Sequence, residues 1–295
     1  MSGEQETTNE HPAVVTAEDF RDDIFARCAV RTDTGLVRDH NEDDFLVMPE
    51  FGVYLVADGM GGHNAGSVAS RICVETVEDY FRERDADGEL PSEPTSHPDD
   101  HLARSLTVAN SAIHRSSMED RNLAGMGTTA VGVRLVGNRL TTCHAGDSRA
   151  YIFRNGHLRQ ISADHSLANF LRQLGRDAEA RLAETTMSNV IMRALGLEPE
   201  VEIEMNVYTV SPGDRVLLCS DGLSDLVHDD DISAVLMNPE LRRFEAAEEL
   251  IDRALANGGR DNVTVMIVDV LDREGYDADD DDEGGRTLRF LNYEE

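Results

Sequence analysis

The chain has 295 residues, 40% of them hydrophobic, and a formal net charge of −31 at pH 7, with arginine as its only basic residue apart from histidine. So acidic a chain repels nucleic acid and anionic membranes, and none of its apolar windows reaches the roughly 18 residues of a membrane span. The start at Met1–Glu10 is polar and acidic rather than typical of a secretory signal, so we expect a cytoplasmic protein. The hydrophobic content is enough for a sizeable core, and we expect a monomer.

The first half of the chain predicts strands, then two helices. Residues 1–24 are expected to form a disordered lead-in, followed by strands at 26–32, 44–48 and 52–57. Residues 66–81 change to a helical period, and a second amphipathic helix carries Leu102, Leu106, Ala109 and Ile113. The segment between the helices, Asp85–Asp100, is rich in proline and acids and is expected to be an exposed loop.

The second half predicts a block of strands and two further helices. Strands are expected at 128–136, 139–145, 149–154 and 157–161, with a hairpin turn at Asn155-Gly156. A short helix near 167–174 precedes turn residues that continue to 200. Strands at 203–210 and 215–220, helices at 230–238 and 243–256 and a strand at 263–270 follow. Residues 271–295 form an acidic tail in which Asp277–Glu283 has six acids in seven residues, so we expect it to be solvated and disordered.

This order of elements indicates an α+β fold. Strands outnumber helices and do not alternate with them, which favours antiparallel sheets with helices packed on the outside over a βαβ arrangement. One domain spanning 25–270 accommodates all of these elements. The four cysteines lie far apart and mostly inside apolar runs, so we expect buried free thiols rather than a metal site or disulfides.

Acidic residues stand at the ends of three predicted buried strands. Two apolar runs end in Asp-Gly, at Asp58 and Asp221, and Asp261 directly precedes a third strand. Any one Asp-Gly could be a simple turn dipeptide. Several crowded carboxylates would instead raise one another's pKa unless a cation neutralised them, and a site made only of oxygen ligands suits Mg²⁺ or Mn²⁺.

Two loops near these acids contain side chains that could take part in catalysis, Arg38 and His63. Arg38 lies four residues before Glu42; it could belong to a solvated charged loop or present a planar guanidinium to a phosphate. The glycine-rich segment from Asp58 to Gly66 has neither a Walker nor a dinucleotide-binding spacing. Its His63 could be simply exposed or could move a proton.

Taken together in chain order, these motifs resemble the type 2C metal-dependent protein Ser/Thr phosphatases, in particular the bacterial members. The resemblance covers roughly residues 26–270. Its motifs are Arg38 with Asn41-Glu42-Asp43, the loop Val56–His63, Gly127-Thr128-Thr129, Gly146-Asp147-Ser148-Arg149, Asn189–Gly196, Ser220-Asp221-Gly222 and Asp261-Asn262.

The resemblance implies a four-layer αββα sandwich, in which helix pairs flank two central antiparallel sheets, and a centre with two Mn²⁺ or Mg²⁺ ions. Asp58 would bridge both ions, the Gly59 carbonyl would bind one, and Asp221 and Asp261 would hold the other. Glu42 would act through ordered water. Asp147 would support a weaker third ion together with Asp221, or it could be a turn acid bonded to its neighbours.

The chemistry implied is hydrolysis of phosphoserine and phosphothreonine by a metal-activated water. Arg38 and the ions would orient the phosphoryl group, and His63 or a metal-bound water would protonate the leaving alkoxide. Phosphorylated proteins would be the substrates, and a bacterial Ser/Thr kinase would be the opposing enzyme in a signalling pathway.

The chain departs from the family pattern at two positions. Ser67 stands where bacterial members often carry Glu, and Met192 stands where Thr is usual, within a flap at about 164–200. The second departure concerns substrate preference. Two alternatives remain open: a phosphatase dedicated to one regulatory switch protein, and a non-catalytic, metal-stabilised binding protein.

Overall fold

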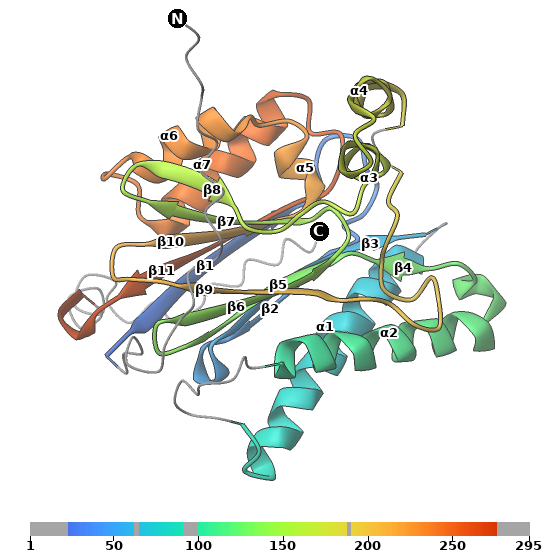
Figure 1. Cartoon of the computed structure of the whole chain (residues 1–295), viewed down its shortest axis with the longest axis horizontal. Helices are drawn as coiled ribbons and strands as arrows, with labels where there is room; N and C mark the ends of the chain where they lie inside the picture. The colour runs from blue at the N-terminus through green and yellow to red at the C-terminus, as the bar shows by residue number, and fades with distance from the viewer. Residues whose placement is uncertain (1–22, 62–64, 91–99, 188–189, 276–295) are drawn as a thin grey trace, which may run out of the picture.

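The computed structural model describes residues 23–61, 65–90, 100–187 and 190–275. Two antiparallel sheets form its centre (Figure 1). The first sheet has the strand order β1 (Phe25–Asp33), β11 (Val263–Leu271), β10 (Arg215–Cys219), β7 (Arg149–Arg154) and β8 (His157–Gln160). The second has the order β2 (Asp43–Met48), β3 (Val53–Met60), β5 (Ala130–Val136), β6 (Arg139–Ala145) and β9 (Glu204–Thr209), and β4 (Gly127–Thr128) pairs with β3.

A helix pair covers the outer face of each sheet (Figure 1). The second sheet is covered by α1 (Ala65–Ala86) and α2 (His101–Glu119), and the first by α6 (Asp229–Met237) and α7 (Arg243–Ala256). The α+β fold with four αββα layers is therefore confirmed.

Three apolar layers hold these four layers together. In α1, Ala69, Cys73, Val77 and Phe81 recur every four residues and are buried against the second sheet. A separate core lies between the two sheets and a third lies under α6 and α7. Strands such as β3 have one face in each of two cores, which explains why their sequences are continuously apolar rather than alternating.

Most predicted elements are present within a few residues of their expected bounds. The hairpin turn between β7 and β8 is confirmed, with positive φ at Asn155 (51°) and Gly156 (79°), the backbone that Asn-Gly favours. Three of the four free cysteines are buried and Cys28 is half-buried. Within the described ranges, no helix is long and apolar enough to cross a membrane.

One expectation about the flap is wrong. Residues after the short helix α3 (Leu167–Gln173) do not form turns only, because α4 (Asp177–Thr186) packs against α3 (Figure 1). On the α4 side the contact is made by the small side chains of Ala180 and Ala183, which give no strong apolar pattern. The loop expected at 85–100 begins later, since α1 continues to Ala86. The lead-in before residue 23, most of that loop and the acidic tail lie outside the described residues.

Candidate active site

The acids that the sequence places at strand ends are brought together where the two sheets meet. Asp58, near the end of β3, lies opposite Asp43 in the antiparallel register of β2 and β3. From the first sheet, β10 leads through Ser220 into Asp221, the first residue of the short helix α5 (Asp221–Ser224). Asp261 lies just before β11.

Asp43 ties the two sheets to each other at this point. Its Oδ2 accepts hydrogen bonds from the hydroxyls of Ser220 (2.8 Å) and Thr264 (2.7 Å), which belong to the first sheet. The Ser220 hydroxyl oxygen in turn accepts a bond from the Thr264 amide at 2.9 Å. From the sequence, Asp43 belongs to the motif Asn41-Glu42-Asp43, but we assigned a metal role only to Glu42. The position of Asp43 opposite Asp58 in the strand pair shows that it too faces the cluster.

Crowded, buried carboxylates dominate the electrostatics of the cluster. Burial raises the pKa of Asp58 well above its usual range, and Asp43, Asp221, Asp147 and Asp261 raise it further. Burial also raises the pKa of Asp221, and there the largest charge contributions come from Asp147 and a further acid, Asp225. Asp225 was not singled out from the sequence, because it follows no strand and belongs to no motif.

Two members of the cluster have pKa values near the neutral range. Burial raises the pKa of Asp43 to about 6, although the two hydroxyl donors oppose the shift. Burial likewise raises the pKa of Asp147 to about 6. Ionising all of these groups at neutral pH therefore costs the folded protein free energy unless a cation is bound.

Several carboxylate oxygens in this region are also buried without a hydrogen-bond partner among the described residues: Glu42 Oε1, Asp43 Oδ1 and Asp147 Oδ1. Buried polar atoms are almost always satisfied by a hydrogen bond or a ligand. Carboxylate and carbonyl oxygens are the ligands that Mg²⁺ and Mn²⁺ prefer. The donor set is thus suited to hard divalent cations.

Arg38 is the cation at the edge of this cluster. Its guanidinium donates to Asp261 Oδ2 at 2.6 Å, and its side chain remains 47% exposed, so part of it can reach an incoming anion. The loop that carries Arg38 is held by Asn262. The side-chain Nδ2 of Asn262 donates to the carbonyls of Thr34 (2.9 Å) and His40 (3.0 Å). Its Oδ1 accepts from the backbone N–H of Glu42 (2.8 Å).

Close backbone packing explains the glycine that follows Asp58. A Cβ atom at Gly59 would lie 2.2 Å from the Gly66 carbonyl oxygen and 2.6 Å from that of Glu42. Only glycine therefore allows β3, the start of α1 and the Glu42 segment to meet here. The Asp58 carbonyl is fixed in turn by the Thr129 amide (2.8 Å) and the Thr128 hydroxyl (2.9 Å).

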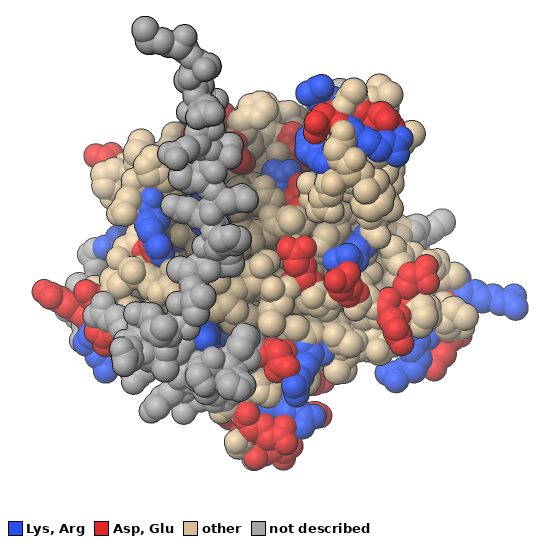
Figure 2. Space-filling model, in the orientation of Figure 1, with Lys and Arg blue, Asp and Glu red and all other residues tan. Residues whose placement is uncertain are grey.

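Four other residues singled out from the sequence are not seen in the acidic cluster. His63 and Asn189 lie outside the described residues. Ser67 lies in the first turn of α1, and Met192 is 53% exposed on the flap. Figure 2 shows acidic side chains spread over the visible face with arginines between them, so the net negative charge is not confined to one patch.

Comparison with known proteins gives consistent results. Residues 37–257 match the family model described as protein phosphatase 2C. The chain is 39% identical over 249 residues to the serine/threonine protein phosphatase PstP of Mycobacterium tuberculosis, covering 84% of this chain and 46% of that protein. It is 35% identical over 252 residues to the serine/threonine phosphatase stp of Listeria monocytogenes, covering 84% of this chain and 98% of that one. The chain thus spans about half the length of the mycobacterial relative.

Solved structures show the same likeness. A crystal structure of M. tuberculosis PstP/Ppp has a TM-score of 0.73 and 39% identity, covering 84% of this chain and 99% of that chain. The PstP catalytic domain in complex with two manganese ions has a TM-score of 0.71 and 40% identity, covering 84% of this chain and all of that chain.

Proposed function

The chain belongs to the protein phosphatase 2C family, and on that premise we propose that it is a metal-dependent phosphatase that hydrolyses phosphoserine and phosphothreonine in proteins. One observation carries the proposal: buried carboxylates with raised pKa values and unsatisfied oxygens converge beside the half-exposed Arg38. When ionised, such a cluster costs the metal-free fold free energy. It is useful where cations must be held next to an anionic substrate.

The proposed metal ligands are the carboxylates of Asp58, Asp221 and Asp261 and the carbonyl of Gly59, with Glu42 acting through water. Asp147 would hold a third ion together with Asp221. Mn²⁺ or Mg²⁺ suits these oxygen donors, and the related PstP catalytic domain binds two manganese ions. When bound, two such ions would act as Lewis acids and lower the pKa of a bound water molecule.

The protein's own groups would position the reaction. The Arg38 guanidinium can bind two phosphoryl oxygens, and its hydrogen bond to Asp261 keeps it oriented. As a water oxygen bonds to phosphorus, the bond from phosphorus to the Ser or Thr oxygen breaks, and the departing oxygen needs a proton. We assign that proton to His63, which follows β3 in the sequence.

We also propose the domain bounds, the oligomeric state, the localisation and the substrates of this phosphatase. Residues 25–270 would be the catalytic domain, acting as a monomer in the cytoplasm on proteins phosphorylated by a Ser/Thr kinase. The relatives stp and PstP support the activity by name.

The test is hydrolysis of phosphoserine and phosphothreonine peptides by metal-stripped protein, with and without added Mn²⁺. We expect hydrolysis only with Mn²⁺, and none by the Asp58→Asn variant although its circular dichroism spectrum is unchanged. Hydrolysis that survives complete metal removal contradicts the mechanism. Mn²⁺ binding without hydrolysis of any phosphopeptide would instead support the non-catalytic alternative.

A further inference from the structure

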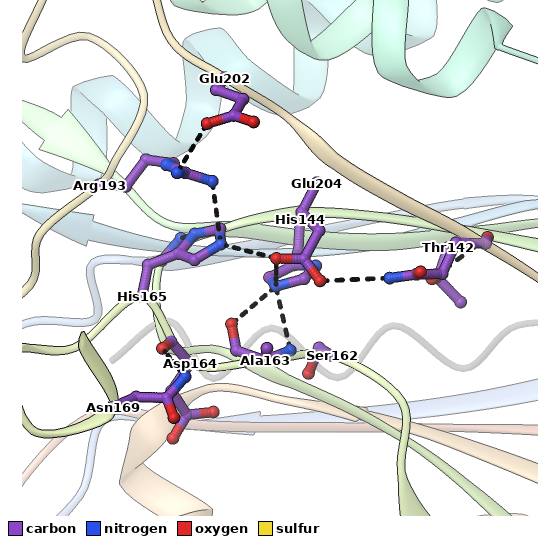
Figure 3. Close-up of polar contacts among 12 residues, drawn as sticks. Thr142, His144, Ser162, Ala163, Asp164, His165, Asn169, Arg193, Glu202 and Glu204 are labelled. Carbon is purple, nitrogen blue, oxygen red and sulfur yellow. Dashed lines mark hydrogen bonds and ion pairs between the residues drawn. The ribbon is translucent and has the colours of Figure 1, made fainter. Parts of the chain in front are cut away.

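Two histidines and a glutamate form a compact group (Figure 3). The group contacts Gly146, the residue before Asp147, and the proposed mechanism gives it no role. His144 is the buried penultimate residue of β6, His165 precedes α3 at the start of the flap, and Glu204 begins β9. The two imidazole rings are stacked, with centroids 4.7 Å apart and planes inclined by 13°.

The first candidate role for this group is a transition-metal site, since one donor atom from each residue lies within 4.8 Å of the others. Its geometry argues against that role. Imidazole lone pairs lie in the ring plane, so two nearly parallel stacked rings do not direct them at one ion. The Arg193 guanidinium also lies 3.1 Å from His165 Nε2 and would repel a cation there.

Hydrogen bonding instead defines the state of His165. The backbone N–H of Gly146 donates to His165 Nδ1 at 3.1 Å, so Nδ1 must carry the lone pair. The hydrogen of the neutral ring is then on Nε2 and is donated to Glu204 Oε2 at 3.2 Å (Figure 3). The Arg193 guanidinium, which can only donate, lies 3.1 Å from the same nitrogen and makes no hydrogen bond to it in this tautomer. Burial lowers the pKa of His165 and the adjacent His144 lowers it further, which favours this neutral form.

His165 and the adjacent Asp164 form hydrogen bonds with the two ends of the turn that carries Asp147, at Gly146 and Arg149. The His165 amide also donates to the Gly146 carbonyl at 2.9 Å, so the two residues are doubly bonded to each other. At the other end of the turn, Arg149 donates to both carboxylate oxygens of Asp164, at distances of 2.7 and 3.0 Å. The inner side of the turn is fixed by the Thr129 and Ser148 hydroxyls, 2.6 Å apart.

His165 is also hydrogen-bonded to the later part of the flap, at Met192. The Met192 amide donates to the His165 carbonyl at 2.7 Å. The next residue, Arg193, lies beside His165 Nε2 and donates to Glu202 at 2.8 Å. His165 therefore connects the flap to the turn that carries Asp147.

We propose that His165 is a positioning residue: its neutral ring holds the Gly146 amide and thereby fixes the Asp147 carboxylate toward Asp221, which couples the flap to the weakest of the metal sites. This inference rests on the proposed function, because it takes Asp147 as a ligand. If binding at that site and the flap position are linked, each must affect the other equally.

A matched pair of variants isolates the one hydrogen bond. In His165→Asn the side-chain oxygen can occupy the position of Nδ1 and still accept from Gly146, whereas in His165→Gln the amide lies near the position of Nε2 and cannot. Both variants lose the stacking on His144 equally. His165→Ala removes all side-chain bonds.

The measurements are calorimetric Mn²⁺ titration and hydrogen exchange of the Gly146 amide in metal-free protein. We expect His165→Gln to weaken only the weakest Mn²⁺ site, by about three- to ten-fold, as loss of one hydrogen bond would. It should also remove the protection of the Gly146 amide, whereas His165→Asn should retain both properties. In an Asp147→Asn background His165→Gln should have no further effect on Mn²⁺ binding.

Equal Mn²⁺ affinities in the Asn and Gln variants, or a loss in the Gln variant that persists in the Asp147→Asn background, overturn the proposal. A further test uses the wild-type protein and so does not depend on the folding of a variant. Nitrogen-15 NMR of His165 should show the ring hydrogen on Nε2. A hydrogen on Nδ1 overturns the inference. These readouts are independent of turnover, so a failure here is distinct from an absence of Mn²⁺-dependent hydrolysis.

Discussion

Replacing Asp147 by asparagine should stabilise the metal-free protein at pH 7.5 while impairing metal binding. The pKa of Asp147 is raised from 3.8 to about 6. One pKa unit corresponds to about 1.4 kcal/mol, so keeping this carboxylate ionised costs the folded state roughly 3 kcal/mol. The asparagine side chain is never charged and avoids this cost.

The sign of the pH dependence follows from the raised pKa. The folded protein takes up a proton on Asp147 more readily than the unfolded chain, so the wild type gains stability as the pH falls through 6 and loses it as the pH rises. Between pH 7.5 and pH 5, the stability advantage of Asp147→Asn over the wild type should shrink by about 1.4 kcal/mol. The new amide group has its own hydrogen-bonding cost, but that cost is the same at both pH values and cancels in this comparison.

The assay is urea unfolding in chelator at pH 7.5 and pH 5, which stays above the sequence pI of 4.5. Asp252→Asn, at an exposed position of α7, is the matched control and should follow the wild type at both pH values. With saturating Mn²⁺ the order should reverse, because only the wild type gains the full free energy of binding. An Asp147→Asn advantage that is the same at pH 5 and pH 7.5 would refute the argument that a buried, ionised carboxylate is the cause.

Three further predictions concern turnover. Asp58→Asn should reduce kcat on p-nitrophenyl phosphate at modest Mn²⁺ by on the order of 100-fold or more with the fold intact, and near-normal turnover would exclude Asp58 from the site. Arg38→Ala should lower kcat/KM by about 10- to 150-fold, which corresponds to roughly 1.5–3 kcal/mol for a charged hydrogen bond, mainly through KM; unchanged kcat and KM would remove Arg38 from substrate binding. Truncation after Glu274, beyond the end of β11, should leave Tm and kcat/KM unchanged across ionic strengths, whereas a several-fold rise in kcat/KM only at low salt would indicate that the acidic tail inhibits the site.

The sequence predicted the acids at strand ends well, because a buried strand followed by Asp-Gly restricts where the carboxylate can lie. Asp58 and Asp221 follow that pattern, and the structure brings them together with Asp147 and Asp261. Their roles as metal ligands remain predictions.

Other features depend on contacts that a single sequence does not contain. Asp43 and Asp44 are adjacent acids, and only the pairing of β2 with β3 shows that Asp43 faces the cluster. Among its described side chains, helix α4 buries only Ala180 and Ala183, so its sequence lacks the apolar stripe that identified α1 and α2. The bonds between His165 and Gly146 join residues 19 positions apart, and no local pattern indicates them.

The most direct test of the account is anomalous diffraction at the manganese edge from crystals grown with Mn²⁺. The account predicts two strong manganese peaks among Asp58, Asp221 and Asp261, both absent in Asp58→Asn crystals. Manganese bound elsewhere, or no manganese at these carboxylates in active protein, would contradict it.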